Sequence, residues 1–316
     1  MSLGYSDLLV IPRLKVHNAN AFSSPYTIGF PAMTAWLGFV HALQRHINQF
    51  SEHSVNFSGV GIVSHEFNLQ TFQGENDFVA SVIGTANPLD SSGKRSPFIE
   101  EPRCHLNASI VIECNTPPHE TDLFLECIQS ILNTKMKLAG GDILEFEHPY
   151  LMNIDNNSLA ENKKFLAKLM PGYAILERRE LMVQAMNEGQ DAIDALIDHL
   201  ALHYKCEVTE GDENNKEVNW TRFKKTLGGN SGGWLVPLAT GFQGISELGE
   251  AKNQRDSNTP HRFAESAVSI GEFKMPYRLD NVQNLFWRYK YQPEQNLYLC
   301  TQQDSYASEE SSFEEF

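Results

Sequence analysis

The alternation of apolar and polar residues in the first 50 positions predicts a strand, a polar connection and a helix. Apolar residues dominate and then alternate over Leu8–Val16, which is typical of a buried strand that Pro12 interrupts near its start. Asn18–Gly29 is rich in Asn, Ser and Gly, and we expect a connection that is too long for a tight hairpin. From Pro31 to Ile47 apolar residues recur at three- and four-residue steps, so a helix should follow.

The same two periodicities continue up to position 150. The clearest strand is His105–Cys114, where apolar residues alternate with largely polar ones and one face should be apolar. Gly59–Gln70 is another strand, in which Val60, Ile62 and Phe67 should be buried. We also predict an extended partner strand over Thr71–Val82, a loop over Gly84–Pro97, a helix over Glu120–Lys137 that Gly140-Gly141 stops, and a strand over Ile143–Phe146.

This order of strand, helix, strand, strand, helix and strand predicts an α+β fold with a ferredoxin-like core over residues 1–150. In that arrangement two helices cover one face of an antiparallel sheet and the other face is free to bind. RNA-recognition motifs fill that face with stacking aromatic residues, but Lys15–Asn18 and His105–Glu113 supply none. A standard RNA-recognition motif is therefore disfavoured.

Residues 151–206 are predicted to form a helical insertion. Ser158–Glu161 fits a capping box for a helix that ends at Met170. A second helical region covers Arg178–Tyr204, with Gly189 as its break.

The rest of the chain is predicted to complete the core. Residues 207–232 are acidic and run into GGNSGG at positions 228–233, which favours a flexible loop. Residues 233–304 should add C-terminal strands: one over Trp234–Leu238, and a hairpin that pairs Phe286–Tyr291 with Asn296–Thr301. Residues 305–316 are expected to be a disordered acidic tail.

Composition places the chain among ordinary globular proteins. The 316 residues are 41% hydrophobic and 21% charged, which is enough for one large core or two smaller ones. No run approaches the ~20 apolar residues of a membrane span, and Met1–Asp7 lacks the features of a signal peptide, so we expect a cytoplasmic protein without membrane contact. The formal net charge of −15 disfavours generic phosphate binding, although part of the acidity lies in residues 207–232 and in the tail.

The sequence carries no motif for catalysis or for a metal. The five cysteines show no CxxC pair or zinc-ligand spacing, and we interpret them as reduced packing residues. Metal-independent RNA cleavage needs an acid and a base with near-neutral pKa, but the spacing of the eleven histidines pairs none of them. HExxH, GxSxG and phosphate-loop motifs are absent. We therefore expect no enzyme activity, no cofactor and no metal.

Two kinds of segment are candidates for ligand contact. The Asn18–Gly29 connection offers amide and hydroxyl groups, together with backbone N–H groups near Gly29, that can bind phosphates and base edges. The alternative is an internally capped loop that only orients the helix. Isolated basic residues could follow an RNA backbone, but such residues more often form surface ion pairs.

The segments IPRL, NANAFSSPYTIGFPA and GFVHALQR resemble the start of a Csy-family subunit of the type I-F CRISPR Cascade, within the RAMP superfamily. Further similar segments follow in order: GVGIVSHEF, EEPRCHLNASI, LAGGDIL, LMPGYAILERREL, GWLVPLATGF, RDSNTPHRF and LFWRYKY. The resemblance fades between Glu207 and Gly232 and in the last dozen residues.

This resemblance implies a non-catalytic subunit that forms a heterodimer with the large subunit and binds the 5′ handle of the CRISPR RNA. It also implies contact with the backbone subunits of the complex and an indirect part in target DNA binding. The alternatives are a CRISPR RNA-processing endoribonuclease of the same superfamily and a protein-interaction scaffold without RNA. With the resemblance, the candidate RNA-binding residues are Arg13, Asn18, Asn20, Ser23, Arg103, Gly140, Gly141, Arg255 and Arg262.

Overall fold

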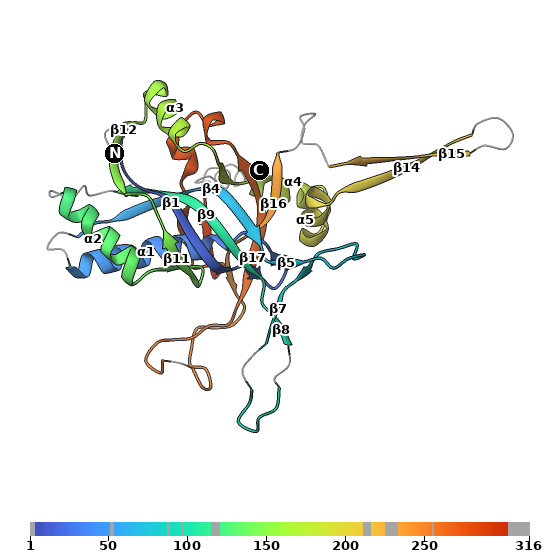
Figure 1. Ribbon diagram of the computed structural model, residues 1–316, viewed down its shortest axis with the longest axis horizontal. Helices are drawn as coiled ribbons and strands as arrows, with labels where there is room; N and C mark the ends of the chain where they lie inside the picture. Colours follow the sequence, from blue (N-terminus) through green and yellow to red (C-terminus); the bar gives the residue numbers. More distant parts are fainter. Residues whose placement is uncertain are drawn as a thin grey trace, which may run out of the picture.

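A large, curled antiparallel sheet runs through the protein (Figure 1). The structure is a computed structural model that describes residues 4–50, 54–86, 89–95, 98–114, 121–210, 216–224, 233–254 and 256–302. The strands of the sheet are β1 (Tyr5–Asn20), β4 (Phe57–Leu69), β9 (Arg103–Cys114), β10 (Lys137–Leu138), β11 (Gly141–Glu145), β12 (Tyr150–Asp155), β13 (Tyr173–Glu177), β16 (Trp234–Gly244), β17 (Ala264–Lys274), β18 (Arg288–Gln292) and β19 (Leu297–Thr301).

Within the described residues the strands lie in the order β10-β11-β1-β9-β4-β13-β17-β16-β19-β18, and β12 also pairs with β1. The helices are α1 (Met33–Phe50), α2 (Thr121–Thr134), α3 (Leu159–Lys168), α4 (Arg179–Asn187) and α5 (Ala192–Leu200), with short 3-10 turns η1 (Pro276–Arg278) and η2 (Val282–Leu285). The chain is thus α+β, as the sequence predicts, and of the strands predicted from residues 1–150 all but Thr71–Val82 lie side by side in the large sheet.

Strand β1 is longer than predicted because it changes partner along one edge. It pairs with β12 along Tyr5–Val10 and with β11 along Lys15–His17. Pro12 lies in the gap between these partners, where a residue without an N–H group costs no ladder hydrogen bond. On its other edge β1 pairs with β9 almost throughout.

Both faces of the central sheet are covered. The largest core cluster packs α1 and α2 against one face through Trp36, Leu43 and Ile128. A second cluster covers part of the opposite face, where Phe165 of α3 and Phe286 after η2 lie against the sheet. The prediction of an open binding face is therefore wrong over this region, and β9 is buried on both sides. The small polar residues in β9 are buried, so they do not mark a solvated face. Their small size permits close packing there.

Several predicted connections are short hairpins instead. The Asn18–Gly29 segment contains the end of β1 and a tight hairpin of β2 (Phe22–Ser24) with β3 (Thr27–Ile28). Thr71–Val82 does not pair with β4. It folds on itself as β5 (Thr71–Phe72) with β6 (Ser81–Val82), and the predicted loop over Gly84–Pro97 begins with β7 (Gly84–Ala86), which pairs with β8 (Phe98–Glu100).

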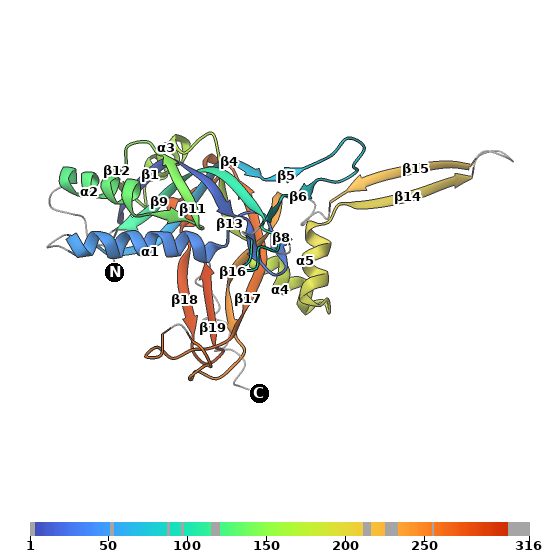
Figure 2. The ribbon, with the colours of Figure 1, turned by 60° about the horizontal axis from the view of Figure 1, so that its bottom comes forward.

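The predicted flexible loop over 207–232 is also wrong for its described part. There β14 (His203–Glu210) and β15 (Lys216–Phe223) form a two-stranded arm that extends away from the body (Figures 1 and 2). The remaining residues of that predicted loop, and those of the predicted disordered tail, lie outside the described residues or at their margin. Both β strands here are long enough to pair, and the acidic composition concealed their alternating pattern.

The second half of the chain mixes confirmed and corrected elements. Ser158 caps α3, and its hydroxyl accepts a hydrogen bond from the Glu161 N–H, as the capping box predicts. Gly189, with φ +96°, separates α4 from α5. Residues 151–206 are not purely helical, however, because β12 and β13 both join the sheet. The predicted C-terminal hairpin is confirmed as β18 with β19.

Two further predictions change at the level of single residues. The second helix ends at Thr134, and Gly140-Gly141 belongs to the tight turn between β10 and β11 instead of stopping the helix. Phe67 was predicted to be buried with Val60 and Ile62, but its side chain is 39% exposed. It lines an open pocket, because its strand passes beyond the core there.

The C-terminal strand is held by a buried carboxylate. Glu177, at the end of β13, accepts hydrogen bonds from the Thr301 hydroxyl at 2.6 Å and from the Gln302 N–H at 2.8 Å. Its other oxygen lies 2.5 Å from the Arg179 guanidinium. Because Glu177 is only 6% exposed, water cannot replace these partners, and the carboxylate and its donors each need the other as a hydrogen-bond partner.

We predict that Glu177→Ala lowers the free energy of unfolding by about 3 kcal/mol, because it leaves a buried guanidinium and two donors without their acceptor. Urea denaturation measures the loss. Glu145→Ala is the matched control, because its ion pair with Lys15 is exposed and should change stability little. If both variants lost the same small free energy of unfolding, the buried role assigned to Glu177 would be wrong.

Candidate nucleic-acid interface

Two bulges shape the surface side of β1. The β1–β9 register shifts between Ile11 and Leu14 and again between Val16 and Ala19. Arg13 and Asn18 lie in these shifts, with φ of 52° and 59°. A bulge inserts an unpaired residue and redirects the side chains beside it, so both positions are built to point groups out of the ladder.

The second bulge creates a pair of stacked histidines that sequence spacing did not reveal. The His17 and His105 rings lie 4.1 Å apart between centroids, and their planes differ by 14°. The Asn18 N–H donates to Nδ1 of His105 at 3.0 Å. That nitrogen therefore carries no proton, and partial burial together with His17 lowers the pKa of His105. Val16 lies opposite Leu106 in the β1–β9 register, which places His17 beside His105. Knowledge of this register would have been needed to predict the contact between the two rings.

The turn between β10 and β11 lies beside the same end of β1. Ala139 and Gly140 adopt φ of 48° and 75°, the mirror-image turn that joins two strands tightly. The Asn20 N–H donates to the Ala139 carbonyl at 2.8 Å. A Cβ on Gly141 would lie 2.8 Å from the Ala19 Cα, so the two backbones can approach only because position 141 has no side chain.

The polar side chains of the β2–β3 hairpin are used within the hairpin. The Asn20 amide donates to the Phe22 carbonyl, and its oxygen accepts from the Phe22 N–H. The Ser23 hydroxyl donates to the Thr27 carbonyl. These contacts match the internally capped alternative for Asn20 and Ser23, because their side chains stabilise the local structure.

The predicted arginines are not gathered at one place. Arg103 lies opposite Asn20 in the β1–β9 ladder and forms an ion pair with Glu101 at 3.0 Å. The Arg262 guanidinium donates to the Asn296 side chain at the turn between β18 and β19. Arg255 lies outside the described residues. The end of β1 thus brings together Asn18, Asn20, Arg103, Gly140 and Gly141, and Arg262 belongs to another surface.

Comparisons with known proteins give the family. Residues 9–300 match the family described as CRISPR-associated protein (Cas_Csy2). The CRISPR-associated protein Csy2 of Pseudomonas aeruginosa (strain UCBPP-PA14) is 32% identical over 315 residues, covering 92% of this chain and 94% of that protein. The chain belongs to the Csy2 family. The Csy-family resemblance found in the sequence is thereby confirmed.

The basic side chains around this end of β1 in the Csy2-family chain are locally neutralised. Lys15 lies 2.6 Å from Glu145, and Lys137 lies 2.6 Å from Asp142. With the Arg103–Glu101 pair, each cation has a carboxylate beside it. Contacts to a nucleic acid here would therefore rely on neutral donors and stacked rings more than on a positive field.

Three observations concern metal ligands, membrane spans and thiols among the described residues. No group of three or more His, Cys, Asp or Glu side chains there could hold a metal ion. No described helix is long and apolar enough to cross a membrane. The buried thiols of Cys104, Cys114 and Cys300 have pKa values raised to about 12 by burial, as expected of packing residues.

The first bulge is fixed by hydrogen bonds that run from β1 through β9 and β4 to the segment before β13. The Arg13 N–H donates to the Ser109 hydroxyl at 3.1 Å, and that hydroxyl lies 2.7 Å from Nε2 of His65. Nδ1 of His65 lies 2.6 Å from the Pro171 carbonyl, which can only accept, so Nδ1 carries the proton and Nε2 accepts from Ser109. The Arg13 guanidinium donates to the Met170 carbonyl. Arg13 therefore has a structural role in addition to any contact with RNA.

We predict that the hydrogen bonds around His65 contribute less to the stability of the fold in acid. Burial lowers the pKa of His65, so the folded protein keeps it neutral, and the unfolded chain takes up a proton below its ordinary pKa of about 6.5. The stabilisation is complete above that pH and is lost as the pH falls through the lowered pKa of the folded state. Urea midpoints at several pH values should therefore fall more steeply in the parent than in His65→Gln.

His41→Gln, on the exposed side of α1, is the control and should keep the parental pH dependence. If His65→Gln also kept it, His65 would not be the titrating group.

We predict that Gly141→Ala destabilises the protein by about 1–3 kcal/mol, because the added methyl group meets the Ala19 backbone, which cannot move aside. Gly38→Ala in α1 is the control, since nothing lies within 4 Å of its added Cβ and alanine favours a helix. Thermal unfolding should show opposite shifts, and a neutral Gly141→Ala would disprove the close approach.

Proposed function

We propose that the protein is a non-catalytic subunit of the type I-F CRISPR surveillance complex, where it forms a heterodimer with the large subunit and holds the 5′ handle of the CRISPR RNA. Family membership supports the complex. The order β11-β1-β9-β4, with α1 and α2 on one face, supports a ferredoxin-like core of the RAMP type. The proposal includes contacts with the backbone subunits and only an indirect part in target DNA binding.

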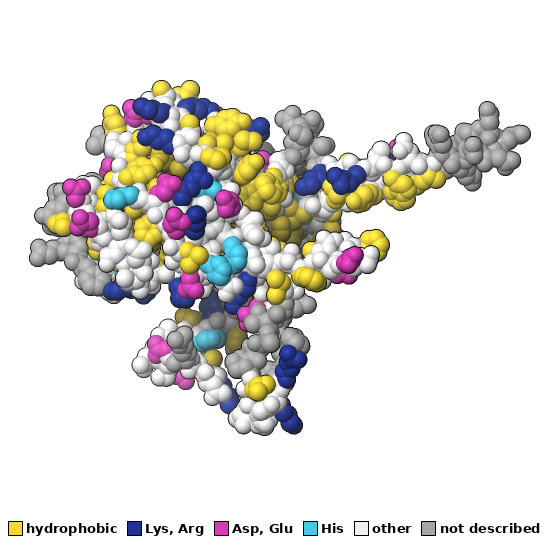
Figure 3. All heavy atoms as spheres, in the orientation of Figure 1, with side chains coloured by type: hydrophobic (Ala, Val, Ile, Leu, Met, Phe, Trp, Pro, Cys, Tyr) yellow, Lys and Arg dark blue, Asp and Glu magenta, His cyan; other side chains and the backbone are white. Residues whose placement is uncertain are grey.

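The observation that carries the subunit role is the amount of apolar side chain left uncovered on extended arms. On the β5–β6 hairpin, Phe72 and Phe78 are exposed. On the β14–β15 arm, Cys206 and Trp220 face each other across the ladder, and the side chain of Trp220 is 64% exposed. Figure 3 shows apolar side chains along this arm. An isolated two-stranded ribbon is marginally stable in water, so a partner surface should cover it.

The RNA role is assigned to the end of β1. The stacked His17–His105 pair offers a flat surface for a base, and backbone groups near Asn18 and Gly140 can bind phosphate or sugar. Arg103 can exchange its carboxylate partner for a phosphate. Arg262 is set apart from this site, because its guanidinium is bound to Asn296.

The alternative function is cleavage of CRISPR RNA, and the histidine pair is the observation that favours it. General acid–base cleavage places the reacting phosphate between two groups. Rings stacked at 4.1 Å leave no space for a phosphate between them, and Nδ1 of His105 already accepts a hydrogen bond. Incubating the protein with repeat RNA, with and without His17→Ala, distinguishes these functions: we expect intact RNA in both reactions.

We predict that His105→Ala weakens handle retention about 5- to 100-fold, the range expected for loss of one stacking contact. RNA retention by this variant should depend on salt as it does in the parent, because the substitution removes no charge. Arg103→Ala should weaken retention and reduce the salt dependence. The measurement is the RNA recovered with the heterodimer at two salt concentrations after co-expression with the other subunits, with circular dichroism to check folding.

Arg262→Ala is the matched control for Arg103→Ala and should retain RNA like the parent. If His105→Ala and Arg103→Ala are folded and also retain RNA fully, the handle is held by another surface or by the partner.

A further inference from the structure

One face of the β14–β15 arm is largely apolar. Residues opposite each other in an antiparallel ladder point to the same side, and successive pairs alternate between the two sides. Tyr204 lies opposite Arg222 and Cys206 lies opposite Trp220, so both pairs share one side with Val218 of the following pair. The Trp220 face therefore consists of Tyr204, Cys206, Val218, Trp220 and Arg222, and all five are exposed.

The opposite face of the arm uses its side chains within the arm. At the base the His203 ring stacks on the Phe223 ring, with 5.4 Å between centroids. Further out, Lys205 forms an ion pair with Glu207 at 2.8 Å, and Asn219 lies opposite Glu207. Polar side chains of this kind can remain in water, so the need for a cover lies on the Trp220 face.

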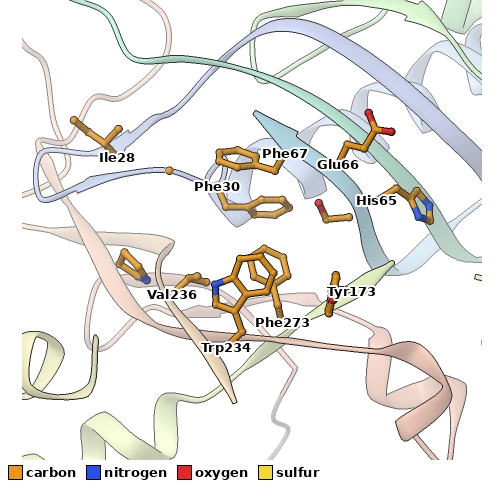
Figure 4. A pocket seen from close by; sticks show the side chains of 12 residues that line it. Ile28, Phe30, His65, Glu66, Phe67, Tyr173, Trp234, Val236 and Phe273 are labelled. Carbon is orange, nitrogen blue, oxygen red and sulfur yellow. The ribbon is translucent and has the colours of Figure 1, made fainter. Parts of the chain in front are cut away.

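Exposed aromatic rings also occur on the body of the protein, but there they rest on the core. Trp234 lies beside the pocket of Figure 4, where its ring is 5.3 Å between centroids from the ring of Phe273, which packs against the largest core cluster. Trp220 is 64% exposed and belongs to none of the three core clusters, because the arm extends away from the body (Figures 1 and 2). Trp220 can therefore be buried only by another molecule.

The sequence towards the outer end of the arm is acidic. Of the eleven residues 207–217, five are Asp or Glu and one is Lys. A nucleic acid could stack on Trp220, but its phosphates would meet this negative charge. The same charge attracts a protein surface that carries Lys and Arg, which is the composition expected of subunits that bind phosphates.

We propose that the Trp220 face docks on a protein partner whose surface is apolar opposite Cys206 and Trp220 and basic towards the outer end of the arm. Trp, Tyr and Arg contribute most often to the binding energy of protein interfaces, and this face presents all three. The opposite face stays in water. The proposal rests on the proposed function only in that the partner is another subunit of the same assembly.

The thiol of Cys206 tests the docking without a bulky substitution. It is exposed, whereas Cys104, Cys114 and Cys300 are buried, and mass spectrometry of the peptides labelled by a maleimide identifies each thiol. We expect Cys206 to react at least tenfold more slowly in the co-expressed complex than in the purified chain. The control combines Cys206→Ser with Asn219→Cys, which moves the thiol to the opposite face, and that thiol should react equally fast in both samples.

Two substitutions at Val218 test the charge of the partner. Val218→Lys and Val218→Glu remove the same apolar side chain, so the difference between them reports the sign of the charge that they meet. Recovery of the partner subunits after co-expression should be at least fivefold lower for Val218→Lys than for Val218→Glu. Circular dichroism checks that both variants are folded.

Several results would overturn the proposal. Equal labelling of Cys206 in the complex and in the purified chain excludes docking of this face, and equal protection of both thiol positions excludes one-sided docking. Protection of Cys206 by CRISPR RNA alone would make RNA the occupant, and protection that rises with the concentration of the purified chain would make it a second copy. Equal recovery with the two Val218 variants contradicts a basic partner.

These failures differ from a failure of the proposed function. A complete complex in which Cys206 reacts freely contradicts the docking and leaves the proposed function intact. A parent chain that recovers no partner subunit contradicts both.

Discussion

The pairing of β1 with β9 is the constraint on which the other features depend. Together these strands contribute to both core clusters, and β1 carries β12, β11 and, through its bulges, both candidate polar sites. A one-residue slip would exchange the faces of every side chain, so the register is fixed by burial on two sides. The bulges at Arg13 and Asn18 are the places where the β1–β9 register shifts.

Covering the second face of the sheet changes where the protein can bind. An open face would offer a broad platform, but Phe165 and Phe286 occupy much of it. The accessible polar and aromatic groups are consequently displaced to strand ends, to turns and to the outer strands. The central strands hold the fold, while the stacked histidines lie near the ends of β1 and β9 and the two-stranded arms extend away from the sheet.

Local periodicity predicted the elements whose pattern is contained in a short stretch of sequence. The first helix, the strand over His105–Cys114, the cap at Ser158 and the C-terminal hairpin all follow from neighbouring residues. The sequence could not predict contacts that need the register of distant strands. His17 meets His105, and Glu177 meets Thr301, across 88 and 124 positions. Phe67 was assigned to the core because the sequence pattern of an apolar strand residue is the same whether the side chain is buried or partly exposed.

The local charge pairs reconcile an acidic chain with the proposed role beside RNA. Lys15, Lys137 and Arg103 each lie next to a carboxylate, so the surface around them creates little long-range field in either direction. Attraction over distance must then come from other members of an assembly, since counterion release scales with the unpaired cations that reach phosphates. What this surface can add is selection at short range, through ring faces and oriented N–H groups that an incorrect RNA conformation would leave unsatisfied. Under the proposed function, the other subunits would supply most of the affinity for RNA, and this surface would supply the selection of RNA conformation.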